Sequence, residues 1–435
     1  MNILLIGSGA REHALAKSIS RSCSGGKLHC IASNMNPGIA RLSTEIVVDN
    51  INDPNTVLQY AKQFNSSLAV VGPENPLSEG VSDVLDDAGI KVVGPKKRLA
   101  QIETSKSFAR DLLVEFGIPG GPQYETFDSM EGVGGFINDL GDDFVVKYDG
   151  LAGGKGVKVS GEHLHSNEEA ISYCQELVDS GGQFVIEEKF VGQEFSLMSF
   201  CDGTTLKHMP VVQDHKRAHD GDTGPNTGGM GTYSDVDHSL PFLREGEVEE
   251  ARSINLKTAD ALRNKFGEGY KGVLYGGFMV TSNGVKLIEY NARFGDPEAM
   301  NVLSLLDSDI VEICDAIAMG TLGNTNVEFK NKATVCKYAV PEGYPDNPLK
   351  GEVIDVSSVS DPDSLFFASV DIRDGKFIEA GSRTVAVVGV GDSITEAEKI
   401  AEAEISRVGG PLFHRTDIGT NDVVQKRVDH MRSLR

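Results

Sequence analysis

The chain has 435 residues, of which 40% are hydrophobic and 24% charged, a balance that excludes a disordered protein. At about 150 residues per domain, this length predicts roughly three folded units. Its 64 acidic and 41 basic residues give a net charge of −23 with no compact basic cluster to offset it, so we expect no nucleic-acid partner.

The first hundred residues alternate short apolar runs with helical patterns. Residues 3–6, 68–71 and 91–93 are predicted strands, and a glycine turn leads from the first of them into a predicted helix over 12–20. Alternation of this kind predicts a doubly wound parallel sheet. The run Pro-Gly-Gly-Pro at 119–122 is a clear break near the end of this unit.

The middle of the chain has a different pattern. Predicted strands at 144–148 and 157–160 are joined by a glycine-rich loop over 150–156, and further strands are expected at 184–188 and 285–290. Neighbouring strands joined by turns indicate antiparallel sheets.

The last hundred residues predict a small mixed α/β domain. A strand is expected at 384–388, and Thr395 with Glu398 matches the capping box of a helix that Gly409 would end. We therefore expect a substrate-binding α/β domain, a lid subdomain, a core with a metal site, and a C-terminal domain. These four units span residues 1–104, 105–194, 195–330 and 331–435.

Compartment signals favour a cytoplasmic protein without membrane contact. No apolar run reaches the roughly 18–20 residues that a membrane helix needs. The apolar start, residues 1–6, has no basic flank or cleavage site and is not typical of a signal peptide. Six cysteines are scattered without a Cys-x-x-Cys pair, which favours reduced thiols over disulfides or a zinc site.

The turn Gly7-Ser8-Gly9 lies between a predicted strand and a predicted helix, as in a dinucleotide-binding fingerprint. The third glycine of G-x-G-x-x-G should stand at position 12, which is Glu12, so the full motif fails. A helix N-terminus beside Arg11 could still bind a substrate phosphate. A plain tight turn and NAD binding remain as alternatives.

The loop over 150–156 resembles a P-loop only superficially. Three residues instead of four separate Gly150 from Gly154, Gly156 follows Lys155 where Ser or Thr is required, and a strand follows instead of a helix. We expect a mobile loop that folds over phosphates with Lys155 supplying charge. An exposed hairpin is the alternative.

Lys147 stands inside a predicted strand, on the same face as Val145. A buried ammonium is costly unless it is paired, and a nucleotide phosphate would be a natural partner. If this face is solvated, Lys147 is an ordinary strand lysine.

Residues 287–293 are the most informative stretch. Glu289, Asn291 and Arg293 share one face if the strand continues through them. A carboxylate beside an amide oxygen suits Mg²⁺ or Mn²⁺ bound together with substrate phosphates, and an arginine can fork onto a phosphoryl oxygen. A surface ion pair between Glu289 and Arg293 is the alternative.

A polar segment over 214–217 is followed by a glycine-rich run over 224–229. We expect a substrate-binding loop, since the segment is too long for a simple turn. His215 and His219 have the i, i+4 spacing of a zinc pair, but no H-E-x-x-H pattern supports zinc.

Taken together, these motifs resemble those of the phosphoribosylamine–glycine ligases, a family of the ATP-grasp superfamily, over essentially the whole chain. The motifs are Gly-Ser-Gly-Ala-Arg-Glu-His-Ala (7–14), Val-Gly-Pro-Glu (71–74), Lys-Tyr-Asp-Gly-Leu-Ala-Gly-Gly-Lys-Gly-Val (147–157), Gln-Asp-His-Lys-Arg (213–217), Asp-Thr-Gly-Pro-Asn-Thr-Gly-Gly-Met-Gly (222–231) and Glu-Tyr-Asn-Ala-Arg-Phe-Gly-Asp-Pro-Glu (289–298). The resemblance implies that ATP, glycine and 5-phosphoribosylamine give glycinamide ribonucleotide, ADP and phosphate in purine synthesis. A glycyl phosphate intermediate, Mg²⁺ or Mn²⁺, and a monomer or weak homodimer are implied as well.

The resemblance also implies site residues, position by position. Glu289 and Asn291 would hold the metal. Contacts with the ATP phosphates or the adenine edge would come from Lys106, Lys147, Gly153, Gly154 and Lys155. Backbone reading of adenine would fall to Glu187, Glu188, Lys189 and Phe190, and Glu194 would hold the ribose.

Substrate binding and catalysis are implied for a second group of residues. Arg293 and Asp214 would orient glycine and the amine, and with Lys155 they are the implied catalytic residues. The implied substrate contacts are Gly9, Arg11, Glu12, Asp214, Lys216, Asn226, Arg293, Gly295 and Asp296, with Gly9, Arg11 and Glu12 at the sugar phosphate.

Some positions depart from the family pattern. Ala10 and Gly153 stand where the family commonly has Gly and Ala, which should be harmless, and Lys189 interrupts the usual apolar adenine segment. The predicted strand over 274–280 offers no carboxylate, so only two protein ligands are expected for the metal. Alternative functions are another ATP-grasp enzyme that activates formate or bicarbonate, a nicotinamide-binding oxidoreductase, and a non-catalytic nucleotide sensor.

Overall fold

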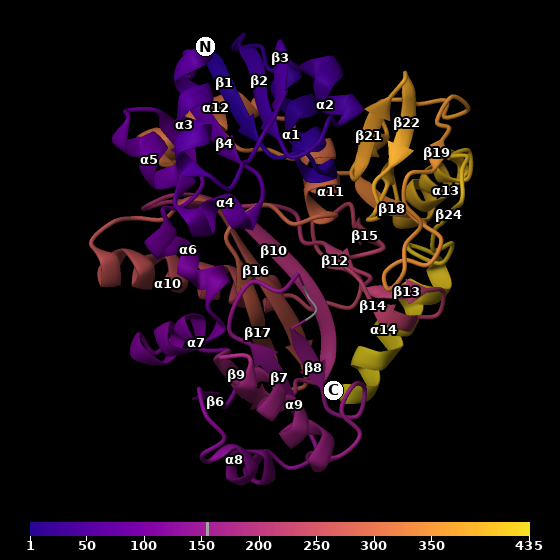
Figure 1. Cartoon of the computed structure of the whole chain (residues 1–435). Helices are drawn as coiled ribbons and strands as arrows, with labels where there is room; N and C mark the ends of the chain where they lie inside the picture. Colours follow the sequence, from indigo (N-terminus) through magenta and orange to yellow (C-terminus); the bar gives the residue numbers. More distant parts are fainter. Residues whose placement is uncertain (154–155) are drawn as a thin grey trace.

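The computed structural model describes residues 1–153 and 156–435. Figure 1 shows an N-terminal region in indigo, a lid in magenta, a central sheet of long strands, and a C-terminal region in orange and yellow. The N-terminus lies at the far end of the N-terminal region, and the C-terminus lies near the lid (Figure 1). No helix in the described part of the chain is long and apolar enough to cross a membrane.

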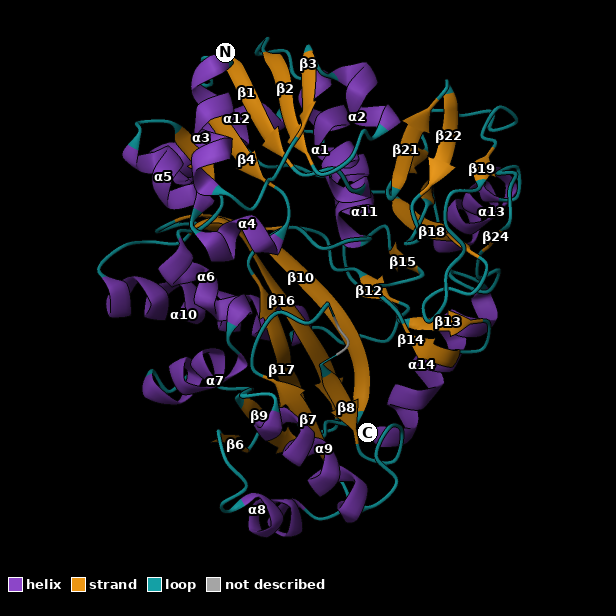
Figure 2. Cartoon of the chain, in the orientation of Figure 1, coloured by secondary structure: helices purple, strands orange, loops and turns teal. Residues whose placement is uncertain are grey.

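The N-terminal region is a five-stranded, fully parallel sheet in the order β3-β2-β1-β4-β5, which confirms the predicted doubly wound fold. Its strands are β1 Asn2–Ile6, β2 Lys27–Ala32, β3 Glu45–Val48, β4 Leu68–Val71 and β5 Lys91–Val93. The helices of this part of the chain are α1 Ala10–Ser20, α2 Pro37–Leu42, α3 Pro54–Gln63, α4 Glu74–Glu79, α5 Val81–Asp87, α6 Lys97–Thr104 and α7 Lys106–Glu115. Helices cover both faces of the sheet (Figure 2).

The lid is an antiparallel sheet in the order β6-β9-β7-β8 with two helices. Its elements are β6 Tyr124–Phe127, α8 Val133–Leu140, β7 Phe144–Tyr148, β8 Val157–Val159, α9 Asn167–Asp179 and β9 Phe184–Glu188. Phe144, Phe184 and Ile186 belong to a hydrophobic cluster that is separate from the main core. The lid therefore has a core of its own.

The central sheet is antiparallel in the order β11-β10-β16-β17. Its strands are β10 Gly192–Asp202, β11 Leu206–His208, β16 Lys271–Thr281 and β17 Gly284–Asn291, and the helices of this region are α10 Glu247–Phe266, α11 Glu298–Leu305 and α12 Ile310–Met319. Between β16 and β17 the register shifts: Gly277 faces Glu289 but Phe278 faces Leu287, which leaves Ile288 as a bulge. Bulges commonly re-aim side chains beside functional sites.

The C-terminal region is built on an antiparallel sheet in the order β12-β15-β18-β23-β20. Its elements are β12 Gln213–Asp214, β13 Arg217–His219, β14 Thr223–Asn226, β15 Gly231–Ser234, β18 Ala333–Pro341, β19 Val353–Ile354, β20 Leu365–Phe367, β21 Val370–Arg373, β22 Lys376–Glu379, β23 Val385–Gly391, α13 Ile394–Ile405, β24 Leu412–Phe413 and α14 Asn421–Leu434. Strands β12 and β15 come from the polar segment singled out in the sequence, and β15 pairs with β18. Part of this segment therefore belongs to the C-terminal sheet.

The predicted start and end of helix α13 are wrong. Ser393, not Thr395, is its N-cap and accepts a hydrogen bond from Glu396 N, and the helix ends at Ile405 instead of reaching Gly409. Both serine and threonine have a glutamate three residues later, so the sequence alone offered two equivalent caps.

A glycine on β23 sets the approach of α13. A Cβ built at Gly389 would lie 1.9 Å from the carbonyl oxygen of Ala397, and that backbone cannot move aside cheaply. Gly389→Ala should therefore lower the free energy of unfolding by about 1–3 kcal/mol or more. Gly135→Ala, in α8 with no neighbour within 4 Å, should instead raise it by up to about 1 kcal/mol. Equal denaturation midpoints for the two variants would contradict this packing.

Candidate active site

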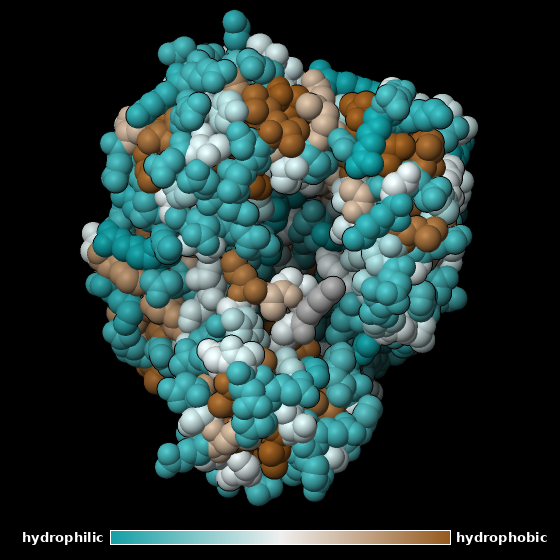
Figure 3. Space-filling view, in the orientation of Figure 1, coloured by the Kyte–Doolittle hydropathy of each residue, from teal (hydrophilic) through white to brown (hydrophobic). Residues whose placement is uncertain are grey.

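A pocket lies on the face of the central sheet, where the segment that contains β12 crosses it. It is lined by Glu194, Phe195, Ser196, Asp214, Lys216, Tyr275, Gly277, Phe278, Ile288 and Glu289. Figure 3 shows this side of the molecule hollowed where the N-terminal region, the C-terminal region and the lid meet. Four of the predicted site residues, Glu194, Asp214, Lys216 and Glu289, thus share one pocket.

The predicted metal ligands Glu289 and Asn291 lie two residues apart at the end of β17, so they share one face of the strand. Opposite Glu289 stands Gly277, which has no side chain to fill the space. A carboxylate and an amide oxygen are hard oxygen donors, and they fit a Mg²⁺ or Mn²⁺ ion that takes its remaining ligands from phosphates and water. No cluster of three or more His, Cys, Asp or Glu side chains suited to a metal occurs in the described residues.

Positive charge surrounds Glu289. Burial alone would raise the pKa of Glu289, but the charges of Lys216, Lys147 and Lys106 bring it below its ordinary value. Three lysines from three different segments therefore point their charge at one carboxylate. A site with this excess of positive charge suits a polyphosphate.

Lys147 is buried, and it pairs with Glu187 in the structure. Glu187 accepts hydrogen bonds from Arg110 Nε at 2.8 Å and Nη2 at 3.0 Å, and it forms an ion pair with Lys147. Arg110 Nη2 and Lys147 Nζ also donate to the bulge carbonyl, Ile288 O, at 2.6 and 3.2 Å. The cluster therefore ties the lid to the bulge that presents Glu289.

The glycine-rich loop is anchored at its start by Lys106, whose Nζ donates to Gly150 O at 2.6 Å. The neighbouring carboxylate of Asp149 accepts hydrogen bonds from the backbone at the start of α7. Gly153 has a positive φ of 54°, which glycine adopts without strain. The predicted phosphate contacts Gly154 and Lys155 lie outside the described residues.

The predicted adenine segment, Glu187 to Phe190, leads from β9 into β10. Lys189 Nζ donates to Ser160 O at 3.0 Å, and the Phe190 ring lies 5.9 Å from Lys286 Nζ. Lys189 therefore holds the segment to the end of the lid hairpin. Further along, the predicted ribose residue Glu194 accepts a hydrogen bond from Lys216 at 2.6 Å.

Arg293 lies beyond the end of β17, so the condition that the strand continues through it is not met. Its guanidinium nevertheless turns back to Asn291 Oδ1 at 3.1 Å. It also pairs with Glu74 at 3.2 Å and Glu103 at 2.9 Å. The proposed surface pair with Glu289 does not form among the described residues, and Arg293 is instead a partly buried cation that joins β17 to the N-terminal region.

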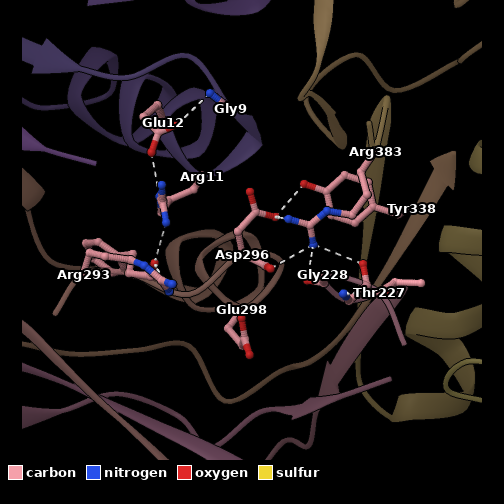
Figure 4. A network of polar contacts seen from close by, with 12 residues as sticks. Gly9, Arg11, Glu12, Thr227, Gly228, Arg293, Asp296, Glu298, Tyr338 and Arg383 are labelled. Carbon is pink, nitrogen blue, oxygen red and sulfur yellow. Dashed lines mark hydrogen bonds and ion pairs between the residues drawn. The ribbon is translucent and has the colours of Figure 1, made fainter. Parts of the chain in front are cut away.

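The turn at the start of α1, the predicted phosphate site, is held in place by Glu12. Gly9 N donates to Glu12 Oε2 at 2.6 Å, so that amide is already bonded. A Cβ at Gly7 or Gly72 would collide with the Glu12 side chain at 2.8 and 2.2 Å, so Glu12 fills the space above both glycines. Arg11 links this carboxylate at 2.6 Å to Phe294 O at 3.1 Å (Figure 4).

Asp296 connects the loop after β17 to the C-terminal region. Its Oδ1 accepts a hydrogen bond from Tyr338 at 2.6 Å and pairs with Arg383 at 3.2 Å (Figure 4). Arg383 also donates to Gly228 O at 2.5 Å and to Gly229 O at 3.1 Å. The glycine-rich run therefore lies next to the loop that carries Asp296.

Asn226, a predicted substrate contact on the polar segment, does not line the pocket, and neither do His215 and His219. Asn226 is exposed on β14, and its backbone pairs with Arg217. His215 is buried with its ring 5.7 Å from Tyr233, whereas His219 is exposed with its ring 5.7 Å from Phe413. Burial lowers the pKa of His215 to about 3, so this imidazole is neutral.

Family models match the chain in three consecutive parts. Residues 1–103 match the N domain of phosphoribosylglycinamide synthetase, residues 104–299 its ATP-grasp (A) domain, and residues 334–421 its C domain. The chain belongs to the phosphoribosylglycinamide synthetase family. The family expected from the sequence motifs is thereby confirmed.

Curated relatives and a solved structure agree with this assignment to the phosphoribosylglycinamide synthetase family. The chain is 49% identical over 435 residues to a phosphoribosylamine–glycine ligase of Methanosarcina barkeri. It is 50% identical over 445 residues to one of Methanocaldococcus jannaschii. Each alignment covers 100% of this chain and 100% of the relative. A crystal structure of phosphoribosylamine–glycine ligase from Thermotoga maritima superposes with a TM-score of 0.82 at 28% identity, covering 96% of this chain and 100% of that one. Biotin carboxylase of Campylobacter jejuni, at 14% identity and a TM-score of 0.72, shares the fold.

Sequence reasoning missed three charged residues that organise the site of this synthetase-family chain: Arg110, Glu298 and Arg383. Arg110 belongs to no sequence motif. It lies 77 positions before Glu187 in the chain and contacts it only in the folded protein. Arg383 comes from a segment that the sequence indicated only as the edge of a strand. Glu298 closes the motif over 289–298, so that motif could have drawn attention to it.

Proposed function

We propose that this chain joins glycine to 5-phosphoribosylamine at the expense of ATP, and releases glycinamide ribonucleotide, ADP and phosphate in purine synthesis. Membership of the phosphoribosylglycinamide synthetase family supports this activity. The observation that carries the proposal is the shared pocket of Glu289, Asp214 and Lys216, which offers a metal ligand, a carboxylate and a cation on one face of the central sheet.

In the first step a carboxylate oxygen of glycine attacks the γ-phosphorus of ATP, the bond to the ADP oxygen breaks, and glycyl phosphate forms. A divalent metal on Glu289 and Asn291 would neutralise charge on the phosphates. Lys106, Lys147 and Lys155 are proposed to hold ATP, with residues 187–190 at the adenine and Glu194 at the ribose. Occupation of this site requires Lys147 to exchange part of its contact with Glu187 for phosphate.

In the second step the amine of phosphoribosylamine attacks the glycyl carbonyl and displaces phosphate. We propose that Arg293 and Asp214 orient the two substrates, with Lys216, Gly295 and Asp296 around them. Arg11 and Glu12 lie where α1 meets the loop that carries Asp296, so the sugar phosphate is proposed to bind on this side. No side-chain nucleophile is needed in either step.

A coupled ADP assay that omits each substrate in turn tests the proposed function. Full turnover should require ATP, a divalent metal, glycine and phosphoribosylamine together. Turnover with formate or bicarbonate in place of glycine would instead indicate another ATP-grasp activity, and nucleotide binding without ADP release would indicate a sensor.

We further propose that the protein works in the cytoplasm as a monomer or weak homodimer. All six cysteines are free thiols, and five of them are buried, which suits a reducing compartment. Light scattering over a range of concentrations checks the oligomeric state, and a stable higher oligomer would contradict the proposal.

A further inference from the structure

The C-terminal helix α14, Asn421–Leu434, packs against β10, the strand that carries Glu194. It runs from the C-terminal region towards the lid and the beginning of β10 (Figure 1). Its Met431 is only 1% exposed and belongs to the main hydrophobic core. The match to the C domain of the family ends at residue 421, so almost all of this helix lies beyond the matched residues. A segment outside that match is therefore fixed beside the proposed nucleotide site.

Hydrogen bonds lead from the middle of the molecule to this helix by way of Glu194. The hydroxyl of Tyr233 donates to Gln213 Oε1 at 2.6 Å. The amide nitrogen of Gln213 donates to the backbone carbonyl of Glu194 at 3.2 Å and to Gln193 Oε1 at 3.5 Å. The amide nitrogen of Gln193 in turn contacts His430 Nδ1, in α14, at 2.5 Å. Side chains therefore join α14 to the backbone of Glu194.

The end points of this chain fix the direction of every bond in it. A backbone carbonyl only accepts, so Glu194 O orients the Gln213 amide, and Gln213 then orients the amide of Gln193. Gln193 Nε2 is therefore the donor, and His430 Nδ1 accepts. Gln193 is 7% exposed and Gln213 2% exposed. Loss of the imidazole would leave a buried N–H group without its acceptor, which is costly and favours another orientation of the Gln193 amide.

The chain of bonds ends at a residue that enters the pocket. Glu194 lines the pocket together with Lys216, whose Nζ donates to Glu194 Oε2 at 2.6 Å. Gln213 holds the backbone of Glu194 from β12 and directly precedes Asp214, another lining residue. Since the backbone of a residue sets the direction of its side chain, the bond from Gln213 helps to determine where the Glu194 carboxylate lies.

We propose that His430 is a positioning residue for the nucleotide, which acts through Gln193 and Gln213 to fix Glu194. The inference rests on the nucleotide site of the proposed function, in which Glu194 holds the ribose of ATP. A carboxylate recognises the ribose hydroxyls only if its supporting contacts hold it in place. A helix that served stability alone would leave this recognition unchanged.

Dideoxy-ATP tests the inference, because it keeps the base and the triphosphate of ATP but lacks both ribose hydroxyls. Calorimetry with Mg²⁺ gives Kd for ATP and for dideoxy-ATP, and the coupled ADP assay gives kcat. In His430→Ala the Kd for ATP should rise about 3–10-fold, the size expected for one lost hydrogen bond. The Kd for dideoxy-ATP and the kcat should change by less than about 2-fold, so the preference for ATP falls.

Two further variants on α14 separate positioning from stability. His430→Asn should restore the preference, because its side-chain oxygen offers an acceptor close to the position of Nδ1 and its helix propensity is similar to that of histidine. Arg432→Ala is the matched control, since this exposed arginine pairs with Asp429 of the same helix. It should leave the preference unchanged.

A double variant tests the path of the effect. Gln193→Leu should lower the preference for ATP as His430→Ala does, so the inference stays testable if His430→Ala folds poorly. Addition of His430→Ala to Gln193→Leu should cause no further loss, because His430 acts through Gln193.

The outcomes distinguish this inference from the proposed function. Equal Kd values for the two nucleotides in the wild type, or an unchanged preference in both single variants, would overturn the positioning role and leave the proposed function standing. Additive losses in the double variant, or an equal loss in Arg432→Ala, would also overturn it. If the wild type binds ATP but releases no ADP with glycine and phosphoribosylamine, the proposed function fails, and the Kd values still decide the role of His430. Loss in both single variants with recovery in His430→Asn supports the inference.

Discussion

Glutamine in place of Glu289 is expected to lower metal-dependent turnover at least about 10²-fold, which corresponds to about 2.7 kcal/mol or more of barrier. The change keeps the size of the side chain but removes the one charged oxygen donor at the end of β17. Because the pKa of Glu289 is held below its ordinary value by three lysines, the carboxylate is fully ionised at neutral pH. The variant therefore loses a complete negative charge that a divalent metal would neutralise.

Titration of Mg²⁺ and Mn²⁺ at saturating ATP measures this effect. The metal concentration for half-maximal activity should rise in Glu289→Gln, while the melting temperature should stay close to that of the wild type. Glu250→Gln is a suitable control, because this exposed carboxylate lies next to the Gly284 turn at the other end of β17. Unchanged turnover in Glu289→Gln would contradict the metal assignment.

The largest effect on stability is expected from Glu187→Gln. Its carboxylate is the only acidic partner of Arg110 and Lys147 in the described part of the chain, and the side chains of all three are at most 5% exposed. Removal of the charge leaves two buried cations without an ion-pair partner among the described residues. The free energy of unfolding should fall by about 3–5 kcal/mol, the usual cost of breaking a buried ion pair on one side.

Chemical denaturation of Glu187→Gln should be compared with Glu125→Gln, an exposed carboxylate on the neighbouring strand β6. The latter should change stability by less than about 0.5 kcal/mol. A drop of similar size in both variants would contradict the role of the buried cluster. The lid has its own core, so it should lose stability before the rest of the protein. Hydrogen exchange of the lid's backbone amides measures this loss.

The contribution of the Glu187 carboxylate to the free energy of unfolding should fall in acid. Burial alone would raise the pKa of Glu187, but Arg110 and Lys147 lower it below its ordinary value. The stabilisation is therefore present above the unfolded pKa of about 4.3 and is lost as the pH falls towards the lower folded value. Glu187→Gln should have a flatter decline of stability in acid than the wild type.

Continuous apolar runs were sufficient to predict the buried strands. Residues 68–71 and 184–188 were predicted with the bounds that β4 and β9 have. Strands β2 and β3 were missed because Lys27, His29 and Glu45 interrupt their apolar pattern, although His29 is buried and stacks on Phe64 at 4.6 Å. Tertiary packing decides such short segments more than local pattern does.

The site was predictable where its residues share one strand or one motif. The two-residue spacing of Glu289 and Asn291 places them on one face, and the structure agrees. The bulge at Ile288 and its support by Arg110 could not be predicted, because they depend on the register with β16 and on a contact between distant segments. For the same reason the pairing of Lys147 with Glu187 could not be predicted.

Oxygen transfer from glycine tests the central claim, activation of a carboxylate by ATP, most directly. Glycine labelled with ¹⁸O in its carboxylate is turned over with ATP, metal and phosphoribosylamine in ordinary water, and the released phosphate is analysed by mass spectrometry. Attack of the carboxylate on the γ-phosphorus predicts one ¹⁸O atom in each phosphate released. Unlabelled phosphate, formed together with glycinamide ribonucleotide, would contradict a glycyl phosphate intermediate and with it the account of the pocket.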